Sequence, residues 1–220
     1  TEFLFAYIEN LLNIEEENLV KKELQEKYKK YFDITKHVSY DLWEMYEGVH
    51  LYSLSAIFSA FDSMIKIYNV LGKNTSDFEN NRLKDEKVNK SINEMSKLQL
   101  EIKNYINENL YDENRKSYVR NTEDKRMDIS ILGSVYPFRV FSPKEKKVLN
   151  TVDNINLTLR TYTGGYQRFE YDHYRNGAPW PIANLWMTLY YLENGEKKKA
   201  KETFDFVLKT AGKHSLLGEQ

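Results

Sequence analysis

The stretch Leu51–Leu71, LYSLSAIFSAFDSMIKIYNVL, is the part of the sequence that best indicates the fold class. It is apolar on nearly every side of a helix, and its polar residues are mostly small serines. A helix of this kind is buried on most sides, so we predict that it lies in an inner layer. Its apolar positions are Leu54, Ala56, Ile57, Phe58, Ala60, Phe61, Met64, Ile65 and Ile67.

The next helical pattern is one-sided. Its apolar residues recur at spacings of three, four and seven with charged residues between them, which predicts an outer helix that packs by a single face. These residues are Val88, Ile92, Met95, Ile102 and Ile106.

The same pair of patterns recurs near the end of the chain. Ile182–Leu192, IANLWMTLYYL, is apolar nearly all round; Pro179 and Pro181 mark its start and Asn194-Gly195 its end. A single apolar stripe then follows, made of Ala200, Phe204, Val207, Leu208 and Ala211. An earlier stripe is made of Val20, Leu24, Tyr28 and Tyr31.

Alternation of inner and outer helices predicts an all-α protein with two concentric helical layers, a double-layer α/α toroid. A four-helix bundle would need four one-sided helices, and a tetratricopeptide array would show a repeat of about 34 residues that this chain lacks. Loops that enter inner helices would then gather at one end of the toroid. Strand content is expected to be low, with 116–120 and 166–171 as short extended candidates at the loop rims.

Composition excludes several classes of function. The chain has 220 residues, 41% of them hydrophobic, and its 32 basic residues balance 33 acidic ones, so no overall field attracts nucleic acid. There is no cysteine and no His or Cys spacing typical of a metal site, and we expect no cofactor. No apolar run approaches the ~18 residues of a membrane span. Lysine-rich stretches at 144–147 and 197–199 are expected to be solvated helix faces.

Two short segments carry carboxylates that could act on a glycosidic bond. DLWE, residues 41–44, contains Glu44, and the final GEQ, residues 218–220, contains Glu219. One carboxyl can give a proton to the leaving oxygen while the other activates water. Taken alone, however, Asp41 could be a helix N-cap and Trp43 a core residue.

A third segment, residues 164–181, is dense in polar and aromatic groups. Arg168, Glu170, Asp172 and Tyr174 alternate along it between two turn signals, Gly-Gly and Asn-Gly. Sugars need both paired hydrogen-bonding groups and aromatic faces, so the segment predicts a sugar site. The alternative is a structural ion-pair cluster.

Four segments in this order resemble glycoside hydrolase family 15, which contains glucoamylases, glucodextranases and some trehalases. They are SYDLWEMYEGVH, DISILGSVYPF, GGYQRFEYDHYRNGAPWPIANLWMTLYYL and HSLLGEQ. The resemblance runs from about Ser39 to Gln220. It implies an (α/α)6 barrel and inverting, exo-acting release of glucose from the non-reducing ends of α-glucans.

The resemblance also implies roles for individual residues. Glu44 would be the general acid and Glu219 the general base. The residues expected to line or support the sugar pocket are Trp43, Arg168, Asp172 and Trp180. An apolar wall of Trp43 and Met45 would raise the pKa of the acid. His50 and His173 are expected to be structural or rim residues, because this chemistry does not need imidazole.

The chain departs from the family in three ways. Met45 stands where many members carry a second acidic residue, and Phe169 where Tyr is common. The earlier loop whose Arg-Asp pair grips the terminal glucose has no counterpart here. We therefore expect residues 1–220 to be a partial (α/α)6 catalytic domain, with its N-terminal part and its C-terminal end absent. Other hypotheses are an α-trehalase or glucodextranase of the same family, and a non-catalytic carbohydrate-binding toroid.

Overall fold

The computed structural model describes residues 38–74, 81–214 and 216–218. The chain divides into two compact units, Thr1–Val38 and Ser39–Gln220, and all elements discussed below belong to the second. The early stripe of Val20, Leu24, Tyr28 and Tyr31 lies outside the described residues, and so does Glu219.

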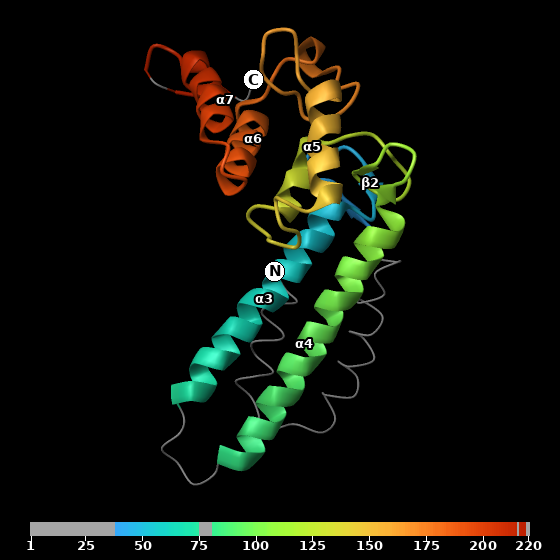
Figure 1. The fold of residues 1–220 in the computed structure, drawn as a ribbon, viewed down its shortest axis with the longest axis vertical. Helices are drawn as coiled ribbons and strands as arrows, with labels where there is room; N and C mark the ends of the chain where they lie inside the picture. Colours follow the sequence, from blue (N-terminus) through green and yellow to red (C-terminus); the bar gives the residue numbers. More distant parts are fainter. Residues whose placement is uncertain (1–37, 75–80, 215, 219–220) are drawn as a thin grey trace. The chain divides into compact units, whose positions relative to one another are not determined.

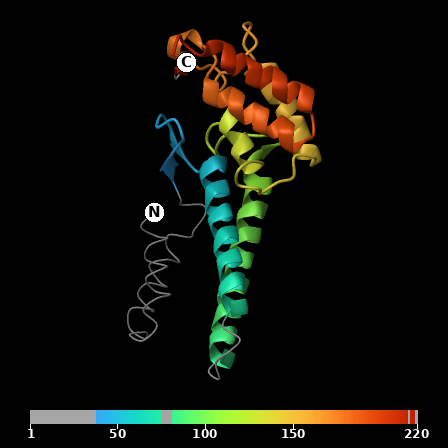
Figure 2. The same ribbon diagram turned by 90° about the vertical axis from the view of Figure 1, so that its left-hand side faces the viewer.

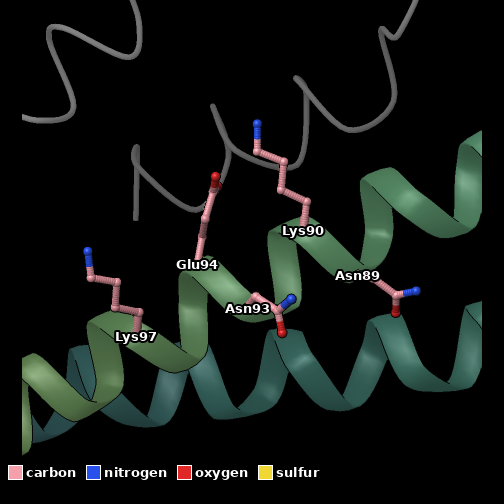
Figure 3. A pocket seen from close by; sticks show the side chains of 5 residues that line it. All are labelled: Asn89, Lys90, Asn93, Glu94 and Lys97. Carbon is pink, nitrogen blue, oxygen red and sulfur yellow. The ribbon is translucent and has the colours of Figure 1, made fainter.

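Two long helices form an antiparallel hairpin, α3 over Leu51–Asn74 and α4 over Asn81–Asn109 (Figure 1). The expected one-sided helix is confirmed, because Met95, Ile102 and Ile106 of α4 are buried. The opposite face of α4 is charged and exposed, and Lys90, Glu94 and Lys97 project from it (Figure 3).

The start of α3 is largely covered, but its second half is buried on one face only, where Met64 and Tyr68 are each 7% exposed. Leu51 and Leu54 are fully buried, whereas Ile67 and Val70 are 51% and 60% exposed. The prediction of a helix buried on most sides is therefore wrong for the second half. In the described part of the chain α3 packs mainly on α4 and on η2, so the remaining face of its far end has no third helix beside it.

A second helical hairpin is formed by α6, Pro181–Glu193, and α7, Lys197–Thr210. Pro181 occupies the first turn of α6, as predicted, because its missing N–H would have no helical partner there. Gly195, with a φ of 83°, allows the tight turn that reverses the chain. The hydroxyls of Thr188 and Thr203 are 2.8 Å apart across the two helices.

The apolar stripe on α7 was predicted only in part. Ala200 and Val207 are buried, but Phe204 and Leu208 are 43% and 54% exposed. Thr203 takes the central buried position instead, because its hydroxyl also donates to a carbonyl of its own helix and so remains satisfied inside. Spacing of three and then four residues, not apolarity alone, thus sets the packed face.

Two short β-hairpins neighbour the long helices, one before α3 and one after α4. The β1–β2 hairpin pairs Ser39–Tyr40 with Glu47–Gly48 and lies beside the start of α3 (Figure 2). The β3–β4 hairpin pairs Tyr111–Asp112 with Ser117–Tyr118, which confirms an extended segment within 116–120. The expected segment 166–171 forms only isolated bridges, at Tyr166 and Phe169.

Three further helices complete the described fold. The 3-10 helix η2, Ile129–Ser134, is buried throughout and packs on α3 and α6, while α5, Lys146–Thr158, packs on β4. A single 3-10 turn, η3, covers Tyr174–Asn176. None of the described helices is both long and apolar enough to cross a membrane.

Candidate functional site

The DLWE segment forms a tight loop between β1 and β2. The Asp41 N–H donates to the Tyr46 carbonyl at 2.9 Å, and the Glu44 N–H donates to the Asp41 carbonyl at 3.1 Å. The Asp41 side chain accepts from the Met45 N–H at 2.9 Å, so it stabilises a turn rather than a helix start. Glu44 itself has a φ of 56°, in the left-handed region that non-glycine residues seldom adopt. The loop thus fixes the backbone at Trp43 and Glu44.

The loop before α3 meets the loop before α6 through aromatic rings. Trp43 lies 5.8 Å from Trp180 and 6.2 Å from Trp186, measured between ring centroids. The prediction that loops entering the inner helices gather at one end is confirmed for these two loops. Trp180, which directly precedes α6, is 6% exposed.

Arg168 joins this aromatic cluster with its charge paired. Its guanidinium binds both oxygens of Asp172, at 2.7 and 2.9 Å, and both side chains are buried. The same guanidinium lies 4.4 Å from the centre of the Trp180 ring and 5.5 Å from that of Trp43. A cation over an aromatic face is attracted by the ring's quadrupole. The structure therefore brings together Trp43, Arg168, Asp172 and Trp180, all four residues that were expected to line or support a sugar pocket.

Of the two expected catalytic carboxylates, the structure describes only one, Glu44. Glu44 is exposed beside Trp43, whereas Glu219 lies outside the described residues, so its distance from Glu44 stays a prediction. Met45 is 47% exposed, so it does not form the buried apolar wall that the sequence suggested.

Sequence reasoning missed two buried residues beneath the loop, Arg120 and Asp128. Arg120 forms an ion pair with Asp41 and lies 3.6 Å from an oxygen of Asp128. Asp128 accepts from the indole N–H of Trp43 at 3.0 Å and from the N–H of Ser130 at 2.8 Å. Burial raises the pKa of Asp128, although the positive charge of Arg120 opposes this. For Asp128, the pattern Asp-x-Ser at the start of η2 could have predicted a helix N-cap; no comparable pattern marks Arg120.

Part of the 164–181 segment is the structural ion-pair cluster that was considered as an alternative. Glu170 is held by two hydrogen bonds from Arg115, at 2.9 and 2.8 Å, and by the Met127 N–H at 3.0 Å. Burial opposes ionisation of Glu170, but these donors prevail and lower its pKa. Glu170 therefore fastens the segment to the preceding loop, and Arg168 faces the aromatic cluster.

The two histidines that were set aside lie in different surroundings. His50 is 3% exposed, with its Nε2 3.0 Å from the Tyr46 carbonyl, and burial lowers its pKa. His173 is exposed and precedes η3. Within the ranges that the structure describes, no group of His, Asp or Glu side chains could hold a metal ion.

The sequence of this chain matches one known protein family. Residues 4–214 match the family model described as "Glycosyl hydrolases family 15". The chain belongs to glycosyl hydrolase family 15. The match covers most of the chain, and the expected family is thereby confirmed.

Two known proteins are similar in sequence to this chain. An uncharacterised glycosyl hydrolase of Methanocaldococcus jannaschii is 29% identical over 183 residues, which cover 77% of this chain and 28% of that protein. Trehalase 1 of Sulfolobus acidocaldarius is 30% identical over 122 residues, which cover 54% of this chain and 21% of that protein. The family 15 chain thus spans less than a third of the length of these relatives.

Solved structures of similar fold are glycosidases. A wild-type glycosidase superposes with a TM-score of 0.67 at 17% identity, over 87% of this chain and 46% of that one. A bacterial glucoamylase complexed with acarbose superposes with a TM-score of 0.61 at 18% identity, over 81% of this chain and 30% of that one. The described helices are accordingly part of the helical toroid of family 15 glycoside hydrolases, as the sequence predicted.

Proposed function

We propose that this family 15 protein releases glucose, with inversion, from the non-reducing ends of α-glucans, as a glucoamylase does. The observation that supports this most is the contact of two loops far apart in sequence. Trp43 and Trp180 lie 5.8 Å apart, and the Arg168–Asp172 pair lies against both rings. Aromatic faces and fixed donors beside a carboxyl group are what hydrolysis of a sugar requires.

In this proposal Glu44 is the general acid. Its carboxyl proton passes to the glycosidic oxygen as the bond from that oxygen to the anomeric carbon breaks. Trp43, its neighbour in the chain, supplies an apolar face for the sugar ring. Both residues lie on one tight loop, so substrate stacked on Trp43 would have the Glu44 carboxyl within reach.

Glu219 is proposed as the general base. It would take a proton from the water that attacks the anomeric carbon on the face opposite the leaving group. Inverting enzymes hold their two carboxyls about 6.5–9.5 Å apart so that this water fits. The glucose released from an α-linkage is then the β anomer.

Arg168, Asp172 and Trp180 are proposed to bind substrate hydroxyls and to shape the pocket. Asp172 binds Arg168 through both oxygens, which holds the guanidinium plane in one orientation. A planar guanidinium presents several donors in a fixed fork, so orientation decides which hydroxyls it can bind.

Hydrolysis of trehalose is the second candidate. It is favoured by the match to Trehalase 1 over 122 residues at 30% identity. Met45 bears on the same choice, because its exposed thioether replaces an acidic group next to the proposed acid. An uncharged side chain there puts the family's usual leaving-sugar preference in doubt for this chain.

One experiment tests both candidates. Full-length protein is incubated in parallel with maltotriose, isomaltotriose and trehalose, and the first glucose released is followed by proton NMR. β-Glucose from maltotriose supports the glucoamylase proposal. Equal amounts of α- and β-glucose from trehalose alone would support the trehalase. α-Glucose from maltotriose would contradict inversion, and no release from any of the three sugars would contradict the proposed function.

A further inference from the structure

Trp43 is anchored from below by a carboxylate. Its indole N–H donates to both oxygens of Asp128, at 3.2 and 3.0 Å. Asp128 is 1% exposed and also caps η2 by accepting from the Ser130 N–H. The half-buried ring of Trp43, proposed to contact the sugar, is therefore hydrogen-bonded to a fully buried carboxylate.

Arg120 links this carboxylate to the loop. It forms an ion pair with Asp41 and lies 3.6 Å from Asp128, with its side chain 1% exposed. Its guanidinium lies over the rings of both Tyr46 and Phe169, at 4.7 Å from each centroid. A third carboxylate, that of Asp124, lies 3.5 Å from the same guanidinium, and a cation held by three carboxylates and two rings has little freedom to move.

Asp41 carries this restraint to the proposed acid. One of its oxygens accepts from the Met45 N–H, and its carbonyl accepts from the Glu44 N–H. The contacts thus run without a break from Asp128 through Arg120 and Asp41 to the backbone on either side of the Glu44 carboxyl.

Capping alone does not account for a carboxylate at this position. A Ser or Asn side chain would cap η2 as well, without the cost of burying a charge. What the carboxylate adds is a second oxygen, which reaches Trp43 and faces Arg120. The second oxygen and the charge together therefore indicate a role directed at Trp43 and, through Arg120, at the loop.

We infer that Asp128 is a positioning residue for the proposed hydrolysis: it holds the ring of Trp43 and, through Arg120 and Asp41, the loop that carries Glu44. The inference rests on the proposed function for its catalytic part. Its structural part, that Asp128 restrains Trp43, can be measured without any substrate.

Two variants separate positioning from capping. Asp128→Ser keeps a cap for η2 but cannot reach the indole of Trp43. Asp128→Asn keeps one oxygen, which can accept from Ser130 and from the Trp43 indole as Oδ1 does, but it replaces the second oxygen with an NH2 group and loses the charge that faces Arg120. Asp112→Asn is the matched control, because Asp112 is also a buried carboxylate that accepts backbone N–H groups, in the β3–β4 hairpin.

The first readout is solvent exchange of the Trp43 indole proton, followed by NMR on protein with labelled tryptophan. We expect exchange to be at least about tenfold faster in Asp128→Ser, because the bond that protects the proton is gone. Asp128→Asn and Asp112→Asn should exchange as the wild type does. Unchanged exchange in Asp128→Ser would overturn the inference, even if the wild-type protein releases no glucose.

The second readout is hydrolysis of maltotriose by the full-length protein. We expect kcat to fall about 10- to 100-fold in Asp128→Ser with KM changed less than about threefold, since a misplaced loop weakens the transition state more than binding. Asp128→Asn should lose less than Asp128→Ser, because it keeps an acceptor for the Trp43 indole but not the charge facing Arg120, and Asp112→Asn should match the wild type.

A double variant gives the decisive comparison. If Asp128 acts through Trp43, adding Asp128→Ser to Trp43→Phe should cost less than about twofold further in kcat. Losses that multiply in full would overturn the action through Trp43, and equal losses in Asp112→Asn and Asp128→Ser would overturn the positioning role altogether. Loss of activity in every wild-type assay would instead contradict the proposed function, and indole exchange would still decide whether Asp128 restrains Trp43.

Discussion

At the scale of single residues, the candidate site depends on backbone geometry as much as on side-chain chemistry. Glu44 holds a left-handed conformation, and Asp41 satisfies the N–H groups around it. Residues in such conformations cost about 1–3 kcal/mol and persist only where their surroundings enforce them. Arg120 and Asp128 provide that enforcement from the buried side of the loop.

Replacement of the proposed acid should remove activity and spare binding. We expect Glu44→Gln in the full-length protein to lower kcat for maltotriose about 10²–10⁴-fold, because the amide keeps the shape but has no proton to give. Substrate affinity, measured by calorimetry, should stay nearly unchanged. A loss of less than about tenfold would show that another residue is the acid.

His50 should make folding stability depend on pH. Burial lowers its pKa, although the carboxylate of Asp41 raises it and the charge of Arg120 lowers it further. The unfolded chain therefore binds more protons here as pH falls. The contribution of neutral His50 is complete above its unfolded pKa of about 6.5 and is lost as pH falls through the lower pKa of the folded state.

Urea unfolding of the wild type and of His50→Gln at about pH 7.5 and about pH 5.5 measures this contribution. The free energy of unfolding should fall more on acidification in the wild type than in the variant. Comparison of the two proteins removes the effect of Asp128, whose raised pKa acts in the opposite direction. Equal falls in both proteins would contradict the prediction.

At the scale of elements, two helical hairpins are joined by loops whose close packing depends on small residues. Gly165 lies under the rim segment, where an added Cβ would come within 2.4 Å of the Phe206 ring and 2.6 Å of Pro179. Gly165 thus packs between Phe206 of α7 and Pro179, two residues before α6, at a distance that only glycine permits.

Gly165→Ala should therefore destabilise the protein. Overpacking of a filled site costs about 1–3 kcal/mol, and we expect a loss in that range in chemical unfolding. Phe206→Leu should recover part of it when combined with Gly165→Ala, since the smaller side chain can move aside. Gly195→Ala is the control: it meets no atom within 4 Å, so its cost comes from the φ of 83° alone and should not respond to Phe206→Leu.

At the scale of the whole molecule, apolar surface is left uncovered on both hairpins. Ile67 and Val70 of α3 are more than half exposed, as is Leu100 of α4, and Phe204 and Leu208 of α7 are exposed in part. Each ~200 Å2 of apolar surface that a neighbour would bury is worth about 5 kcal/mol, comparable to the stability of a domain. Neighbouring structure on these faces would therefore contribute strongly.

We accordingly expect the 220-residue chain alone to be marginally stable or prone to aggregate, and to release no measurable glucose from maltotriose. The full-length protein should be more stable and should release glucose from maltotriose. Calorimetry and a glucose assay on the two proteins in parallel provide the test. Cooperative melting together with turnover by the 220-residue chain would contradict this expectation.

Sequence by itself determined the helical class, the start of α6 and the turn that follows it, and it singled out four residues that the structure brings together. Pro181 and Gly195 act locally, through a missing N–H and a positive φ, so their effects can be read without a tertiary structure. Four segments in fixed order were specific enough to predict the family, and Trp43 and Trp180 met as expected.

Only the tertiary structure decided what lies beneath the loop and which faces are covered. Arg120 and Asp128 act through Asp41 and Trp43, which are far from them in sequence, and no local pattern encodes such a contact. In the same way, exposure of Ile67 and Phe204 depends on which helices stand beside them. Apolar periodicity records the tendency of a face to be buried, whereas burial itself is a property of the neighbours that tertiary packing brings to it.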